Sequence, residues 1–119
     1  MSKAGYALPN SDTIHQTKLD NGMTVLVYEN PAVESVVIYG SLLTGSVFEP
    51  LKRSGIASMT ANALLRGTST RDFETLHSEL EDIGAELDMS TSKYRMTFSG
   101  RALAEDFSTL IDVFADSLR

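Results

Sequence analysis

The sequence predicts an α+β domain in which an antiparallel or mixed sheet carries its helices on one face. Three observations lead to this fold class. Some short apolar runs are continuous or alternate with polar residues, as in strands, and other stretches place apolar residues at helical spacing. These segments follow one another in the order strand, strand, helix, helix, strand, strand, helix (β-β-α-α-β-β-α). A length of 119 residues is enough for one such domain with a modest core.

Composition limits the classes of function. Hydrophobic residues make up 42% of the chain and charged residues 22%, as in ordinary globular domains, and no apolar run reaches membrane length, so no membrane partner is expected. The net charge of −6 and the scattered basic residues argue against nucleic acid as a partner. The absence of cysteine excludes disulfides and thiolate metal sites. The N-terminus lacks the regions of a signal peptide, so the cytoplasm is the default compartment, with the periplasm as the alternative if a leader was removed.

The first elements are an arm and a hairpin. Residues 1–16 show no periodicity and are interpreted as an N-terminal arm, with residues 17–119 as the domain. His15 is expected to be exposed and uninvolved, because no other ligand lies near it in the sequence. Residues 17–19 and 23–28 are predicted to form a hairpin around Asn21-Gly22, a pair favoured in type I′ turns.

A strand and a turn follow. Residues 33–44 contain a nearly continuous apolar run, which predicts a strand covered on both faces. Residues 45–50 form the turn that leads to the next helix. Glu49 in this turn is interpreted as an exposed residue with a structural role rather than as a catalytic carboxylate, because a lone carboxylate rarely makes a site.

Two helices are predicted next. Residues 55–67 have helical spacing, with Ser54 as N-cap and Gly67 at the end, and Ser58 and Asn62 lie one turn apart with Ala61 beside them. Residues 71–83 form the second helix, capped by Ser69 or Thr70. Its His77 and Glu81 are expected to form a surface ion pair, since two ligands alone do not make a zinc site.

The last elements are two strands and a helix. Residues 85–91 and 93–99 alternate apolar and polar side chains, and the short link between them predicts an antiparallel hairpin. Residues 102–118 carry a long apolar stripe at helical spacing, which is expected to lie on the sheet.

The first helix carries a resemblance to a known family. Its Gly55-Ile56-Ala57 and Leu64-Leu65-Arg66-Gly67-Thr68 resemble the frame around the H-x-x-E-H motif of the pitrilysin, insulysin and mitochondrial processing peptidase family, the inverzincin zinc metallopeptidases. The two histidine positions of that motif fall on Ser58 and Asn62, and the glutamate position falls on Ala61. The resemblance implies a processing-peptidase-like domain, present here as its N-terminal portion, with a further glutamate ligand beyond Arg119.

The three substituted positions predict that zinc catalysis is lost. A hydroxyl is a poor zinc ligand, an amide oxygen suits harder cations, and a methyl group cannot carry a proton. We therefore expect no catalytic residues, no metal ligands and no cofactor in this chain, although active members of the resembled family hold zinc.

The resemblance also implies a peptide-binding strand. Residues 84–91 resemble the family's G-[AG]-x-x-[ND]-A-x-T strand, an exposed edge on which an extended substrate pairs in active members. Peptide capture by main-chain pairing does not depend on catalytic side chains, so the edge is either a retained peptide site or simply an edge. The candidate binding residues are Ala85, Glu86, Leu87, Asp88, Met89, Ser90 and Thr91.

These inferences lead to one leading hypothesis and two alternatives. The chain is interpreted as a non-catalytic homologue of zinc metallopeptidases that acts as a structural or peptide-holding partner of an active homologous subunit. The alternatives are a zinc metalloendopeptidase whose catalytic site lies outside this chain, and a free-standing peptide-binding module. A partial domain is also expected to self-associate through apolar faces left open.

Overall fold

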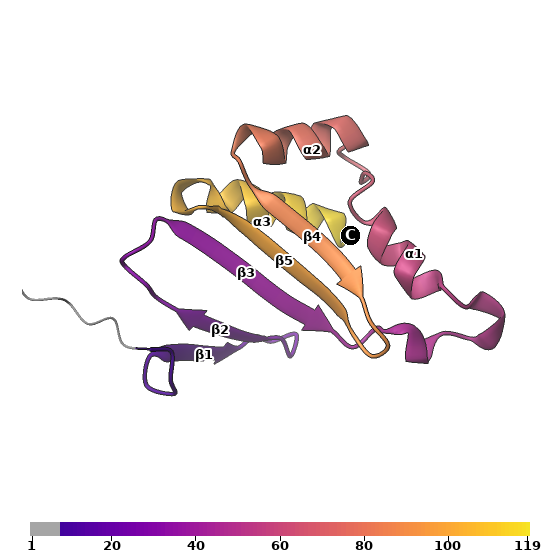
Figure 1. Ribbon diagram of the computed structural model, residues 1–119, viewed down its shortest axis with the longest axis horizontal. Helices are drawn as coiled ribbons and strands as arrows, with labels where there is room; N and C mark the ends of the chain where they lie inside the picture. The colour runs from indigo at the N-terminus through magenta and orange to yellow at the C-terminus, as the bar shows by residue number, and fades with distance from the viewer. Residues whose placement is uncertain (1–7) are drawn as a thin grey trace, which may run out of the picture. The chain divides into compact units, whose positions relative to one another are not determined.

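A computed structural model describes residues 8–119, so residues 1–7 of the predicted arm lie outside the described part. The chain divides into two compact units, residues 1–34 and residues 35–119. The elements follow the order strand, strand, strand, helix, helix, strand, strand, helix (Figure 1). The α+β class and the predicted order of elements are confirmed. One short strand precedes the elements of that order.

The first unit is a hairpin. Strand β1 (Ile14–Lys18) pairs antiparallel with β2 (Thr24–Tyr28), and Gly22 adopts a φ of 86° in the turn, which glycine tolerates at no steric cost. The predicted arm is too long, because residues 14–16 already belong to β1. The Asn10 side chain accepts hydrogen bonds from the amides of Asp12 and Thr13 and forms a local turn before the strand.

The second unit is built on a three-stranded antiparallel sheet. Strands β3 (Ser35–Leu42), β5 (Met96–Leu103) and β4 (Glu86–Thr91) lie in the order β3-β5-β4. Strand β5 is central and extends to Leu103, so the prediction that a helix begins at residue 102 is wrong. Ala102 pairs with Val36 across the ladder and is buried, an environment that helical periodicity in the sequence does not reveal.

Three helices accompany the sheet. Helix α1 (Ile56–Ala63) lies beside β4, while α2 (Phe73–Asp82) and α3 (Phe107–Ser117) pack on one face of the sheet (Figure 1). Helix α2 is capped by Asp72, whose side chain accepts from the Thr75 amide at 2.8 Å, and not by Ser69 or Thr70 as predicted. Hydrogen bonding from the Thr75 side chain, and then from its amide, lowers the pKa of Asp72.

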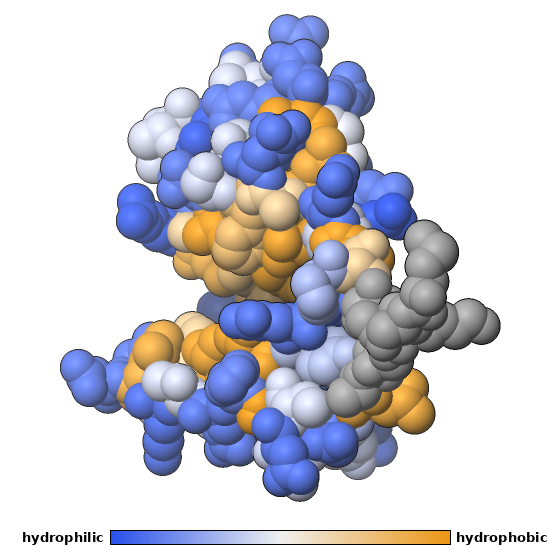
Figure 2. Space-filling view, turned by 90° about the vertical axis from the view of Figure 1, so that its left-hand side faces the viewer, coloured by the Kyte–Doolittle hydropathy of each residue, from blue (hydrophilic) through white to orange (hydrophobic). Residues whose placement is uncertain are grey.

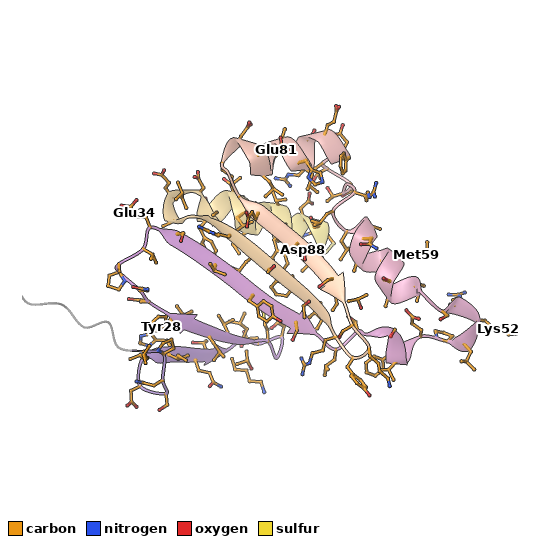
Figure 3. All side chains as sticks on the ribbon, in the orientation of Figure 1. Tyr28, Glu34, Lys52, Met59, Glu81 and Asp88 are labelled. Carbon is orange, nitrogen blue, oxygen red and sulfur yellow. The ribbon has the colours of Figure 1, made fainter. Side chains whose placement is uncertain are left out.

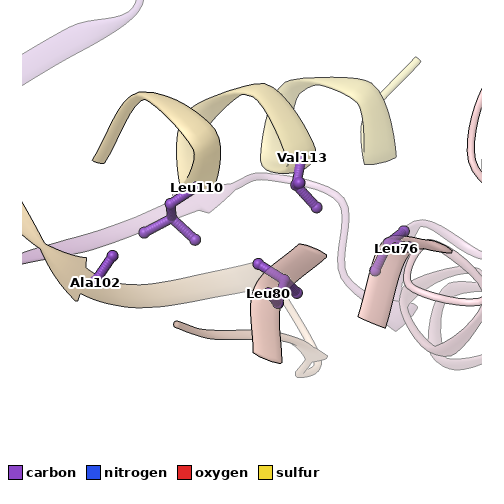
Figure 4. Packing of buried hydrophobic residues seen from close by; sticks show 5 residues of the cluster. All are labelled: Leu76, Leu80, Ala102, Leu110 and Val113. Atoms are coloured by element: carbon purple, nitrogen blue, oxygen red, sulfur yellow. The ribbon is translucent and has the colours of Figure 1, made fainter. Parts of the chain in front are cut away.

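The core lies between the sheet and the helices α2 and α3 (Figure 4). Leu76, Leu110 and Val113 are fully buried, and Leu80 and Ala102 complete the cluster. Gly100 in β5 is buried, and a Cβ there would meet the Ile38 side chain of the neighbouring strand β3. Glycine at this position therefore leaves room for Ile38, which packs against the core.

Within residues 35–119, no element covers the opposite face of the sheet, in contrast to the prediction for residues 33–44. Val37 and Tyr39 alternate with the core-facing residues of β3, and their exposed fractions are 66% and 75%. A continuous apolar run therefore does not mark a doubly covered strand here. Figure 2 shows apolar residues open to the surface among polar ones.

Candidate functional site

Helix α1 is held at its start by a carboxylate. Gly55 is the N-cap with a φ of 95°, and Glu49 accepts hydrogen bonds from the amides of Gly55 at 2.8 Å and Ala57 at 2.7 Å. A negative charge is favourable at this helix end because the first amides have no partner within the helix. Glu49 thus has the structural role expected of it but is half-buried, and the predicted cap Ser54 makes no cap hydrogen bond.

The segment before α1 is fixed to the turn between β4 and β5. The amide of Ser46 donates to the Ser92 carbonyl at 3.1 Å, and the amide of Val47 donates to the Lys93 carbonyl at 2.8 Å. Gly45 is buried there, and a Cβ would collide with the backbone of Lys93 and Tyr94. This close backbone contact requires glycine and sets where α1 begins relative to β4.

The three motif positions lie on two sides of α1. Ser58 and Asn62 are exposed, whereas Ala61 is 2% exposed and is the buried residue of the helix. In the neighbouring strand β4 the buried residue is Met89, at 5%. The position that would hold a general base is therefore enclosed, and its own side chain is only a methyl group.

This donor set does not fit a catalytic zinc ion. Zinc sites use imidazole, thiolate or carboxylate ligands, and a hydrolytic site also needs a group that moves the proton of the bound water. Ser58, Ala61 and Asn62 supply a hydroxyl, a methyl and an amide. No reaction step through a metal follows from these residues.

The two histidines do not supply the missing ligands. His15 lies exposed in β1, in the first unit. His77 lies in α2 and does not form the predicted ion pair with Glu81. Its Nε2 is 3.2 Å from the Leu65 carbonyl oxygen, and its ring packs at a tilt against Phe73, with the ring centroids 4.2 Å apart. Within residues 8–119, no group of three or more His, Cys, Asp or Glu side chains is placed to hold a metal ion.

The predicted binding strand does lie at an edge. Strand β4 pairs with β5 on one side, and the Ser92 amide donates to the Arg95 carbonyl at the hairpin end. Hydrogen bonding alternates along an antiparallel strand, so the main-chain groups of Leu87, Met89 and Thr91 point away from β5. In the part of the chain that the structure describes, these three amides take part in no turn, loop or cap hydrogen bond. The outer side of β4 also has no partner strand among the described residues.

A polar cluster that the sequence did not indicate fixes the segment between α1 and α2. Asp116, in α3 and 8% exposed, accepts hydrogen bonds from the Thr68 and Thr70 hydroxyls at 2.6 and 2.8 Å and from Arg71 at 2.8 Å. Arg71 also pairs with Glu79 at 2.9 Å. The partners are 45 or more residues apart in the sequence, so no local pattern reveals them.

This cluster predicts a dependence of stability on pH. Hydrogen bonds from Thr68, Arg71 and Thr70 lower the pKa of Asp116 from 3.8 to about 2. A carboxylate whose pKa is lower in the folded state than in the unfolded state stabilises the fold at pH values above its unfolded pKa. For Asp116 this stabilisation is lost as the pH falls from 3.8 through 2. We expect Asp116→Asn to lower the urea midpoint at neutral pH, with a difference from wild type that shrinks toward pH 2. Asp112→Asn, on the exposed side of the same helix, is the control; a constant difference across this range would contradict the assignment.

Helices of the described residues are all too short or too polar to cross a membrane.

Comparison with known proteins identifies the family of the chain. The model of the insulinase family, peptidase family M16, matches residues 24–119. A structure described as a peptidase M16 inactive domain from Pseudomonas fluorescens superimposes with a TM-score of 0.80 at 20% identity, covering 87% of this chain and 26% of that one, which shows the fold alone.

Curated relatives agree with the family model. An uncharacterized zinc protease of Rickettsia felis and a probable mitochondrial-processing peptidase subunit beta of Arabidopsis thaliana are each 30% identical over 103 residues, 87% of this chain and 25% and 19% of their own. Cytochrome b-c1 complex subunit 1 of Caenorhabditis elegans is 34% identical over the same share of this chain and 22% of its own. The chain thus spans about a fifth to a quarter of the length of these relatives. The predicted resemblance is confirmed: the chain belongs to the insulinase family, peptidase family M16.

Proposed function

We propose that this chain is a non-catalytic member of the family that serves as a structural or peptide-holding partner of an active homologous subunit. The observation that carries the proposal is the set of motif positions in α1, where Ser58, Ala61 and Asn62 stand in place of two ligands and a base. These three side chains offer no ligand set for zinc and no group that can move a proton. The features that position the helix are present: the cap formed by Glu49 and the backbone contact at Gly45.

The relatives support a partner role. Several of them are named as subunits, including mitochondrial-processing peptidase subunit beta of Neurospora crassa, 29% identical, and the cytochrome b-c1 subunit already described. A protein that works beside a catalytic homologue keeps the fold and its surfaces but has no need of its own zinc. The structural neighbour described as an inactive domain has the same architecture.

The test is co-purification of the full-length protein with a homologue that retains H-x-x-E-H. We expect a stable complex whose zinc content, measured by mass spectrometry of the metal, equals that of the active subunit alone. Stoichiometric zinc in the full-length protein without a partner, together with chelator-sensitive cleavage of peptides, would overturn the proposal in favour of a metallopeptidase whose catalytic site lies outside this chain.

The free edge of β4 supports the peptide-holding form of the proposal. Leu87, Met89 and Thr91 present main-chain groups that β5 does not use, and an extended peptide pairs with such groups as an added strand. Helix α1 lies beside this strand (Figure 1), so a peptide here would run next to the former catalytic positions. Figure 3 shows where Asp88 of β4 and Met59 of α1 lie along these two elements.

Proline at residue 91 tests this edge. By the register of β4 and β5, the Thr91 amide points away from β5, so Thr91→Pro removes an outward amide without breaking a ladder bond. We therefore expect weaker binding of a labelled mixture of unstructured casein peptides, measured by fluorescence anisotropy. Thr91→Ala is the matched control, because it removes the same side chain and keeps the amide. Equal binding by both variants, with unchanged circular dichroism, would show that peptides do not pair with this edge.

A further inference from the structure

One end of the second unit presents an exposed surface that is both apolar and basic. Its apolar residues include Leu51 at 99% exposed, Phe48 at 65% and Tyr94 at 56%. Its two segments are tied together, because the amides of Ser46 and Val47 bond to the turn between β4 and β5. We call this surface the basic tip; its residues are Val47, Phe48, Leu51, Lys52, Arg53, Lys93, Tyr94 and Arg95.

Charge is distributed very unevenly over the second unit. The basic tip holds four basic side chains and no acidic one, and Glu49, the acidic residue between Phe48 and Leu51, already caps α1. Residues 67–91 and 96–119 hold eleven acidic and three basic side chains. In a chain with a net charge of −6, the basic tip is thus a local exception. A negatively charged membrane would repel the rest of the unit, so a protein surface is the better counterpart for the tip.

A hollow on α2 is acidic and partly apolar, and so complements the basic and apolar tip. It is a shallow depression of about 580 Å³, open to solvent, and all its lining residues belong to α2: Phe73, Glu74, Thr75, His77, Ser78 and Glu81. The tilted Phe73 and His77 rings, whose centroids are 4.2 Å apart, give the hollow an apolar wall. Neither Glu74 nor Glu81 forms an ion pair within residues 8–119. Figure 3 shows Glu81 on α2 and Lys52 at the far end of the same unit.

We propose that the basic tip of one copy of this chain docks into the acidic hollow of a second copy. Leu51 projects from a short turn with Lys52 and Arg53 directly after it, so an apolar side chain would enter against Phe73 while the two cations meet Glu74 and Glu81. Tip and hollow lie apart on one unit, so the contact forms between molecules. A small contact of this kind is weak, and salt weakens it further because its charges are exposed.

Charge reversal tests the contact in solution. The tip variant is Lys52→Glu with Arg53→Glu, and the hollow variant is Glu74→Lys with Glu81→Lys; all four side chains are exposed, so the fold is expected to hold. The measurement is sedimentation velocity at low salt, with protein concentrations up to about 1 mM. We expect wild type to associate and each variant to associate at least about tenfold more weakly. An equimolar mixture of the two variants should associate again, because each reversed surface meets its complement.

The control carries the same change in net charge elsewhere. Lys18→Glu with Arg119→Glu reverses two exposed cations outside the tip, and this variant should associate at low salt more strongly than the tip variant. A wild-type chain that stays monomeric, variants that associate as wild type does, or a mixture that fails to recover association would each overturn the proposal. Binding of monomeric wild type, but not of the tip variant, to anionic lipid vesicles would also overturn it and assign the tip to a membrane surface.

Discussion

Replacing Ala61 by glutamate, which restores the acidic residue of the family motif, is expected to destabilise the protein and not to confer activity. Ala61 is 2% exposed, so a carboxylate at this position loses its hydration inside the protein. The loss should be on the order of 3 kcal/mol or more in the free energy of unfolding, since burying an unpaired charge belongs to the most damaging substitutions. Urea unfolding followed by circular dichroism measures it directly.

The other two motif positions provide matched controls on the same helix. Ser58→His and Asn62→His change exposed side chains and should shift the free energy of unfolding by no more than about 0.5 kcal/mol. If Ala61→Glu were as harmless as these, the space beside α1 would be open enough for a base. The view of α1 as a closed structural helix would then be wrong, and a triple variant would merit a test for zinc-dependent cleavage.

Leu110→Ala is expected to produce a loss of similar or greater size in the core. Leu110 is fully buried between α3 and the sheet, in one cluster with Leu76, Leu80, Ala102 and Val113 (Figure 4). Truncating a buried leucine removes its transfer free energy and leaves a cavity, which together cost about 2–5 kcal/mol. For a domain whose total stability is about 5–15 kcal/mol, this loss removes a large fraction of it.

Leu51→Ala is the control for the core substitution. It removes the same atoms from a side chain that is 99% exposed, so the midpoint of thermal unfolding should stay close to that of wild type. Equal effects of the two substitutions would mean that α3 does not pack on the sheet in solution. A large effect of Leu51→Ala alone would mean that this side chain makes a stabilising contact. The docking proposal expects such a contact only at protein concentrations at which copies associate.

Much of the fold follows from local signals in the sequence. The apolar stripe of α2, the alternation of β4 and the glycine at residue 22 each indicate their element because the relevant partners are near in the sequence. The substitutions in the motif of α1 were also readable, since their meaning depends on donor chemistry alone. Element boundaries depend on distant partners: β5 runs four residues beyond its predicted end because Ala102 pairs with Val36 of a distant strand.

The candidate site shows the same division. That β4 is an edge follows from its resemblance and its place in a hairpin, but that it lies beside α1 depends on the contact of Gly45 with the β4–β5 turn. The role of Glu49 as the cap of α1, the turn of His77 toward the Leu65 carbonyl and the cluster around Asp116 all join residues that are six to 48 positions apart. Hydrophobic periodicity in the sequence does not reveal such hydrogen-bonded pairs.

The sequence by itself determined the family, the order of the elements and the absence of a ligand set in α1, because side-chain chemistry and hydrophobic periodicity are properties of the chain. Only the tertiary structure decided which face of β3 stays open, which carboxylates are used in capping and in the Asp116 cluster, and where the basic tip and the acidic hollow lie. These features arise when distant segments meet, and burial and hydrogen bonding then depend on neighbours that the linear sequence does not specify.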